Sequence, residues 1–168
     1  MEINKLQKIF GVGPMGAVIS LLLLALFAWA DSMFKLPVMV AYTGLMKSIG
    51  VVLIILGLGL HFWSFSTLRN WWADNKLCTK GPFKHFRHPM YAAWITFVCP
   101  GTALYLNSWL YLFWLLLLHM IWHKFVKKEE IIMTDTFGEA YIDYARRTGR
   151  FFPIWVANFI DRTKVMLV

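Results

Sequence analysis

Charged residues are scarce in this chain of 168 residues. Asp, Glu, Lys and Arg together make up 15%, and hydrophobic residues make up 59%, which is too apolar for an ordinary soluble domain. Cysteine is scarce too, with Cys78 and Cys99 alone, so a disulfide-stabilised secreted domain is excluded and we expect both thiols to be structural. Length favours a single membrane domain over residues 1–168.

The lack of charge is concentrated in three runs, Gly11–Ala30, Ser48–Leu68 and His88–His123. Each of the first two is long enough for one helical span, and we interpret the first as a retained helix rather than a signal peptide. The third run is too long for one crossing. Leu106-Asn107-Ser108 divides it evenly and offers polar turn residues, so we expect a reversal there.

These runs predict an all-α, polytopic integral membrane protein with about four transmembrane helices. The third and fourth would form a tight helical hairpin, followed by cytoplasmic C-terminal helices and an interfacial tail from Ile154. The expected spans are about 12–30, 44–66, 89–106 and 108–125.

Basic residues are distributed unevenly around these spans. The segments 1–10, 69–87 and 124–164 hold fifteen of the seventeen Lys and Arg residues, and the segment 31–47 holds two. The positive-inside rule then places both termini in the cytoplasm, of an inner or plasma membrane if the source is prokaryotic. Loops that face anionic lipid explain the net charge of +8 better than a nucleic-acid partner, so we expect the membrane and no nucleic acid.

Two of these basic segments contain patterns that suggest chemistry. Arg87 and His88 come directly before Pro89, which suits the first position of a helix, and a helix N-terminus with nearby cations can bind a carboxylate or phosphate. Glu129-Glu130 follows the fourth expected span, where a carboxylate could bind an ammonium group or a ribose hydroxyl. A basic membrane-surface loop and a solvent-screened acidic pair remain the alternatives.

A third pattern is the basic segment Arg146–Arg150. Its guanidinium groups could supply fork-shaped donors for a carboxylate, and a patch that binds lipid headgroups is the alternative. His119 and His123, four residues apart, could be combined with other histidines into a metal site. With so few cysteines, we expect both histidines to form hydrogen bonds between helices or to lie near the cytoplasmic interface, and we expect no metal.

Taken in order, several of these pieces resemble the isoprenylcysteine carboxyl methyltransferase family and its phospholipid N-methyltransferase relatives. The resemblance covers residues 44–153. Its pieces are Gly50, Gly57 and Gly59, then Gly81-Pro82-Phe83, Arg87-His88-Pro89-Met90-Tyr91, Ser108, Glu129-Glu130, Phe137-Gly138-Glu139 with Tyr141 and Tyr144, and Arg150-Phe151-Phe152-Pro153.

The resemblance implies an enzyme that uses S-adenosylmethionine and acts at the cytoplasmic membrane face on a lipophilic small molecule or lipid. It implies cofactor-binding segments at 69–91 and 124–153. The catalytic residues would be Arg87, Glu130 and Arg150, with Arg147 as an alternative to Arg150. The residues implied to contact the cofactor are Gly57, Gly59, His88, Pro89, Tyr91, Glu129, Glu130 and Tyr141.

The acceptor is left open between a carboxylate and an amine. A carboxylate is already a nucleophile, whereas a protonated amine needs a group such as Glu129 or His88 to take its proton. Two other functions remain open at this point. The element Arg87-His88-Pro89 also resembles membrane sterol reductases that use a nicotinamide cofactor, and a catalytically inactive membrane scaffold could retain the same fold.

Overall fold

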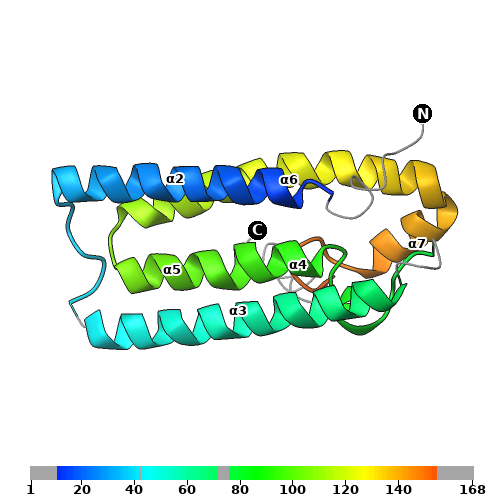
Figure 1. The fold of residues 1–168 in the computed structure, drawn as a ribbon, viewed down its shortest axis with the longest axis horizontal. Coiled ribbons are helices and arrows are strands. Elements are labelled where there is room, and N and C mark those ends of the chain that lie inside the picture. Colours follow the sequence, from blue (N-terminus) through cyan, green and yellow to red (C-terminus); the bar gives the residue numbers. More distant parts are fainter. Residues whose placement is uncertain (1–10, 42, 72–75, 155–168) are drawn as a thin grey trace, which may run out of the picture.

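The computed structural model describes residues 11–41, 43–71 and 76–154, and these residues are mostly helical. Four helical segments run alternately up and down along one axis (Figure 1). The first two are α2 (Gly13–Phe34) and α3 (Thr43–Trp71). The third is continuous through α4 (Pro89–Ala92), the π-helical η3 (Ala93–Val98) and α5 (Cys99–Leu106), and the fourth is α6 (Leu110–Phe137). Two short helices, η2 (Gly81–Lys84) and α7 (Glu139–Arg147), complete the described chain.

Three of these helices are long and apolar enough to cross a membrane: α2, the Thr43–Arg69 part of α3, and α6. Their outer surfaces carry exposed apolar side chains, such as Leu21 and Leu22, each 65% exposed. Large apolar groups so exposed require lipid rather than water around them. The prediction of an all-α integral membrane protein is therefore confirmed. Among the described residues there is no β-strand, and only two isolated bridges occur.

The bundle is assembled from two close helix contacts. On one side, α3 lies against α5 where Gly50 and Gly101 bring the two backbones together. A Cβ atom added at Gly50 would lie 2.5 Å from the carbonyl oxygen of Gly101. On the other side, α2 lies along α6, where Gly16 faces the Trp122 ring and the indole of Trp122 donates to the Ser20 hydroxyl over 3.0 Å. Glycine at these contacts is the usual means by which membrane helices approach closely.

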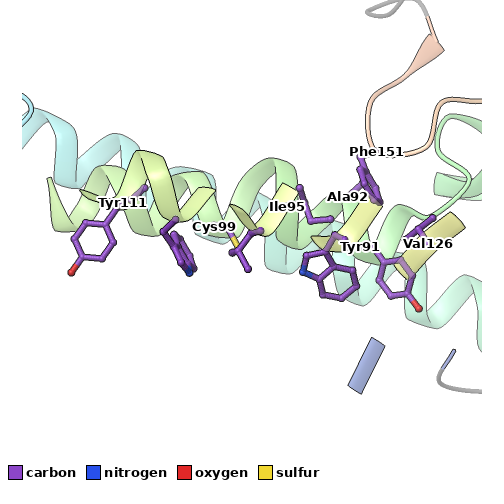
Figure 2. Packing of buried hydrophobic residues seen from close by; sticks show 11 residues of the cluster. Tyr91, Ala92, Ile95, Cys99, Tyr111, Val126 and Phe151 are labelled. Atoms are coloured by element: carbon purple, nitrogen blue, oxygen red, sulfur yellow. The ribbon is translucent and has the colours of Figure 1, made fainter. Parts of the chain in front are cut away.

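Between these contacts lies a core that follows the length of the bundle. Figure 2 shows its labelled side chains spread from Tyr111 at one end to Val126 and Phe151 at the other. Most members come from the Pro89–Leu106 segment and α6, while Phe151 reaches in from the segment after α7 and is 1% exposed. The segment after α7 therefore contributes Phe151 to the core of the helix bundle.

The connection between α5 and α6 is a short turn at residues 107–109. Asn107 ends α5 with a positive φ of 53°, a conformation that Asn tolerates well. Its side-chain amide exchanges hydrogen bonds with both backbone groups of Val40, at 3.2 and 2.9 Å. The neighbouring Ser108 hydroxyl donates to Asp31 over 2.6 Å. These bonds join the loops at one end of the bundle into one unit.

Several boundaries differ in detail from the expected spans. The second helix begins at Thr43, so Lys47 lies in its first turns, with its ammonium 5.7 Å from the centre of the Tyr105 ring. Helix α6 continues twelve residues past the expected end of the fourth span, to Phe137. The expected interfacial tail after Ile154 lies outside the described residues, as do residues 1–10.

Candidate functional site

At the end of the bundle opposite Asn107, four parts of the chain meet. They are the segment 81–91, the later turns of α6, helix α7, and the segment 148–153 (right side of Figure 1). Most of the residues expected to bind a cofactor or an acceptor lie in these parts. Arg87 and Arg150, for example, are 63 positions apart in the sequence, so folding of the chain is needed to bring the site together.

Helix α7 docks on the loop that precedes α4. Gly138, with φ 55°, ends α6 and lets the chain reverse, and α7 then buries Tyr141 and Tyr144. The Tyr144 hydroxyl donates to the backbone carbonyl oxygens of Phe83 and Phe86, at 2.7 and 3.1 Å. Burial raises the pKa of Tyr144 above its usual range, so this hydroxyl remains a donor.

The segment after α7 is held to the same loop through its backbone. The amide of Arg87 donates to the carbonyl oxygen of Gly149 over 2.7 Å, and the amide of His88 donates to that of Arg150 over 3.3 Å. Thr96 adds a bond from its hydroxyl to the carbonyl oxygen of Phe151. These bonds fix the Arg150 side chain beside Arg87 and His88.

The carboxylate of Glu130 is the centre of the cluster. Arg150 binds both of its oxygens, through Nε over 3.1 Å and through its terminal nitrogen NH2. Arg87 Nε and His88 Nε2 each lie 3.5 Å from Glu130 Oε1. The Glu130 side chain is only 13% exposed, so its charge is balanced chiefly by the two guanidinium groups.

The adjacent Glu129 has a different environment. Its Oε2 accepts a hydrogen bond from the Tyr91 hydroxyl over 3.1 Å, and the Tyr91 ring stacks on His88 with centroids 5.6 Å apart. The turn before α2 lies over the same pair, since a Cβ atom added at Gly11 would lie 2.8 Å from Glu129 Oε1. The two neighbouring carboxylates therefore face two kinds of partner, cationic groups and a hydroxyl.

Three buried polar atoms of this cluster have no hydrogen-bond partner within the described residues. They are the Tyr141 hydroxyl and, with contacts of 3.5 Å to Glu130 Oε1 that are not hydrogen bonds, Arg87 Nε and His88 Nε2. A buried polar group without a partner costs about 1–3 kcal/mol, so such a concentration favours a ligand that would bind them. Burial raises the pKa of Tyr141, and the nearby Glu130 charge raises it further, so its hydroxyl stays neutral.

Three other residues that were predicted to contact the cofactor have different surroundings. Pro89 is buried at the start of α4, directly after His88. Gly57 packs against the Pro89–Leu106 segment, because an added Cβ atom would lie 2.7 Å from Val98 and 2.9 Å from the Ala93 carbonyl oxygen. No described residue lies within 4 Å of a Cβ atom added at Gly59. A cofactor role for Gly57 and Gly59 stays a prediction.

The structure also separates the two arginine candidates. Arg150 is the one that joins Glu130, whereas Arg147 is exposed at the end of α7. The chain turns between them at Thr148, whose buried hydroxyl donates to the Tyr144 carbonyl oxygen.

His123 is a member of the cluster that sequence reasoning did not assign to the site. Its Nδ1 lies 2.9 Å from the NH1 nitrogen of Arg150, and its Nε2 lies 3.0 Å from Nε2 of His119. The spacing in the sequence could have indicated it, because residues 123 and 130 are two helical turns apart and lie on the same face as each other. Among the described residues, no three His, Cys, Asp or Glu side chains are grouped so as to hold a metal ion.

Comparison with known families matches residues 45–140 to the phospholipid methyltransferase family, which is more than half of the chain. The chain belongs to the phospholipid methyltransferase family. No curated protein sequence was found to match it. The matched part runs from α3 into α7 and includes Arg87, His88 and both glutamates, whereas α2 and Arg150 lie outside it. Membership implies that the protein is a membrane methyltransferase.

Proposed function

We propose that this phospholipid methyltransferase family member transfers a methyl group from S-adenosylmethionine to a lipophilic acceptor at the cytoplasmic face of its membrane. One observation carries the proposal. Glu130 is surrounded by Arg87, His88 and Arg150, and the buried Tyr141 hydroxyl beside this cluster has no hydrogen-bond partner among the described residues.

The residues present fit the proposed cofactor, which has a carboxylate, an ammonium group and ribose hydroxyls and therefore needs partners of both signs. His88 would bind the carboxylate, since its buried Nε2 makes no hydrogen bond among the described residues. Glu129 and Glu130 would bind the ammonium group or a ribose hydroxyl, and Tyr91 and Tyr141 would contribute hydroxyl groups. When bound, the cofactor supplies an electrophilic methyl group.

An apolar groove supports the proposal that the acceptor is lipophilic. It has a volume of about 400 Å³ and lies between the Pro89–Leu106 segment and α6. Its lining includes Cys99 and Pro100 on one side, Leu112 and Leu116 on the other, and His119. His119 contacts His123, which contacts Arg150, so a hydrocarbon chain in this groove would lie close to the charged cluster.

Catalysis by these side chains would rest on position and charge rather than on a nucleophile of the protein. Arg87 would orient an acceptor carboxylate, because Arg150 already uses three of its nitrogens on Glu130 and His123. Holding the reactants in line and away from water would supply most of the rate enhancement. For an amine acceptor, Glu129 or His88 would take the proton.

The same proposal includes a membrane arrangement. The Pro89–Leu106 segment, which carries no charged residue, would be a further span of 18 residues, paired with α6 as a helical hairpin around the Asn107 turn. With four spans, the basic segments 69–91 and 124–153 lie on one side, which the positive-inside rule assigns to the cytoplasm together with both termini. Residues 1–168 would form a single membrane domain.

Isothermal titration of the detergent-purified protein with S-adenosylhomocysteine tests this proposal. We expect binding by the native protein and a loss of at least about tenfold in affinity for Glu130→Gln, which keeps the shape but removes the charge between the guanidinium groups of Arg87 and Arg150. Glu139→Gln is the matched control, because Glu139 is exposed at the start of α7. No binding by the native protein, or equal losses in both variants, would contradict the proposal.

The acceptor class is tested separately with a lipid extract and a labelled methyl donor. Label that alkali releases indicates a methyl ester and hence a carboxylate acceptor, whereas label that resists alkali indicates a methylated amine.

A further inference from the structure

The guanidinium of Arg150 is held from two sides by one helix. Nε and NH2 bind the Glu130 carboxylate, and NH1 lies 2.9 Å from Nδ1 of His123. Glu130 and His123 both belong to α6 and lie seven residues apart, on the same face of the helix. The Arg150 side chain therefore spans two turns of α6 and connects them to the segment that follows α7.

This geometry determines where the histidine protons are. A guanidinium group can only donate hydrogen bonds, so Nδ1 of His123 must accept and carries no proton. The proton of the neutral ring is then on Nε2, which donates to Nε2 of His119 over 3.0 Å. His119 accepts this bond and keeps its own proton on Nδ1. The result is a hydrogen-bond chain with one direction, from Arg150 through His123 to His119.

We propose that His123 is a positioning residue that acts through Arg150: it holds the guanidinium in the orientation in which Nε and NH2 face Glu130. Without an acceptor at NH1, only Glu130 orients the guanidinium, which can then share its donors between Glu130 and solvent. Phe151 limits the His123 ring from the other side, with ring centroids 4.8 Å apart at 74°. Glu130 thus depends on a residue two turns away on its own helix.

The hydrogen-bond chain from Arg150 to His119 also restricts which side chains can accept a proton. His123 could accept one only at Nδ1, which would turn its acceptor into a donor facing Arg150. His119 could accept one only at Nε2, which would face the Nε2 proton of His123. While these contacts are intact, neither histidine serves as the base for an amine acceptor, and Glu129 and His88 remain the candidates.

Two substitutions separate positioning from packing. His123→Asn keeps an acceptor, because the amide oxygen of Asn can take the place of Nδ1. His123→Leu keeps an apolar side chain of similar size on α6 but offers no acceptor. A role in packing predicts that Leu is tolerated at least as well as Asn in this apolar helix, whereas positioning of Arg150 predicts the reverse order. Met120→Leu, at a lipid-facing position of the same helix that is 58% exposed, is the matched control.

The first measurement does not depend on the proposed function. Nitrogen-15 NMR of histidine-labelled protein in detergent, assigned with the His123→Asn variant, reports which ring nitrogens carry protons. We expect His123 to be neutral with the proton on Nε2, and His119 to be neutral with the proton on Nδ1. A proton on Nδ1 of His123 would overturn the inference whether or not the protein is a methyltransferase.

The second measurement is the affinity for S-adenosylhomocysteine, and this part rests on the proposed function. We expect His123→Leu to weaken binding about tenfold and His123→Asn to remain within about threefold of the native protein, at temperatures where all variants are folded. Equal affinities of the Leu and Asn variants would overturn the positioning role. Absence of binding by the native protein would contradict the proposed function instead, and the NMR result would still decide the inference.

Discussion

The hydroxyl of Tyr91 and the carboxylate of Glu129 form a hydrogen bond of 3.1 Å between the start of the Pro89–Leu106 segment and the later part of α6. The same tyrosine ring lies almost parallel to His88, with an interplanar angle of 7°. Tyr91 thus orients one carboxylate through its hydroxyl and one imidazole through its ring.

The Tyr91→Phe substitution separates these two contributions, because it removes the hydroxyl and leaves the stacked ring. We expect a threefold to tenfold loss in affinity for S-adenosylhomocysteine, about the net value of one hydrogen bond. Titration calorimetry of the purified protein measures it. Tyr105→Phe, at a half-exposed tyrosine far from the cluster, serves as the control, and an equal loss in that variant would argue against a role for the Tyr91 hydroxyl.

Tyr144 and Tyr141 are both buried in α7, but we expect their replacement by Phe to change the free energy of unfolding in different ways. Tyr144→Phe leaves two carbonyl oxygens without their donor and should lower the free energy of unfolding by about 1–3 kcal/mol. Tyr141→Phe removes a buried hydroxyl that has no partner in the described part of the chain, so stability should stay equal or rise while ligand affinity falls. Thermal unfolding in detergent and ligand titration, carried out on both variants, distinguish the two roles.

The same two phenols predict a dependence on alkaline pH. Burial raises the pKa of both above the ordinary value of about 10, so folding favours their neutral forms. Their contribution to stability is fully present below about pH 10 and is lost as the pH rises further, because the unfolded chain then releases protons that the folded chain retains. The double variant Tyr141→Phe, Tyr144→Phe should therefore lose less stability than the native protein between about pH 9 and 11. An equal loss in both proteins would contradict this account.

Gly57 and Gly59 also predict different responses. Gly57→Ala places a methyl group against Val98 and the Ala93 carbonyl oxygen and should lower the melting temperature by several degrees. Gly59→Ala meets nothing within 4 Å among the described residues and should leave the melting temperature unchanged or slightly raised. If Gly59→Ala nevertheless weakens S-adenosylhomocysteine binding, the prediction that this glycine gives a cofactor room is supported. Gly44→Ala, at an equally open position near the start of α3, is the control.

The membrane orientation is tested by labelling single cysteines introduced at the two ends of the bundle. Lys84 is exposed in the basic segment between α3 and α4, and Leu36 is 38% exposed in the loop after α2. With the buried Cys78 and Cys99 replaced by alanine, a membrane-impermeant maleimide applied to intact cells should label Leu36→Cys and not Lys84→Cys. Labelling in the reverse order would place the charged cluster on the outer face.

Much of the fold could be predicted because uncharged runs determine where helices cross a membrane. The first two runs predicted α2 and α3, and Leu106-Asn107-Ser108 predicted where the chain turns. The extent of α6 could not be predicted in the same way. Hydropathy falls at Lys124, where charged residues begin, but the backbone hydrogen bonds of a helix do not depend on hydropathy and continue to Phe137.

The site could be predicted as a set of residue types but not as a set of contacts. The motif around Arg87 and His88 and the Glu129-Glu130 pair have local signatures, so sequence reasoning brought them forward. The choice of Arg150 over Arg147 depends on the extended Thr148, which turns the chain back toward α6. The contact between Arg150 and His123 joins residues 27 positions apart, and no local pattern encodes it.

Helix α6 also works as a spacer of fixed length. At about 1.5 Å per residue, the twenty steps from Leu110 to Glu130 correspond to about 30 Å, close to the thickness of the bilayer's hydrocarbon layer. One extra residue in that stretch would rotate Glu130 by about 100° and turn it away from Arg150. Seven extra residues would restore its direction but shift it by about 10 Å along the axis. Insertions and deletions within α6 would therefore break the contact between Glu130 and Arg150, whereas changes of length in the loops between helices would preserve it.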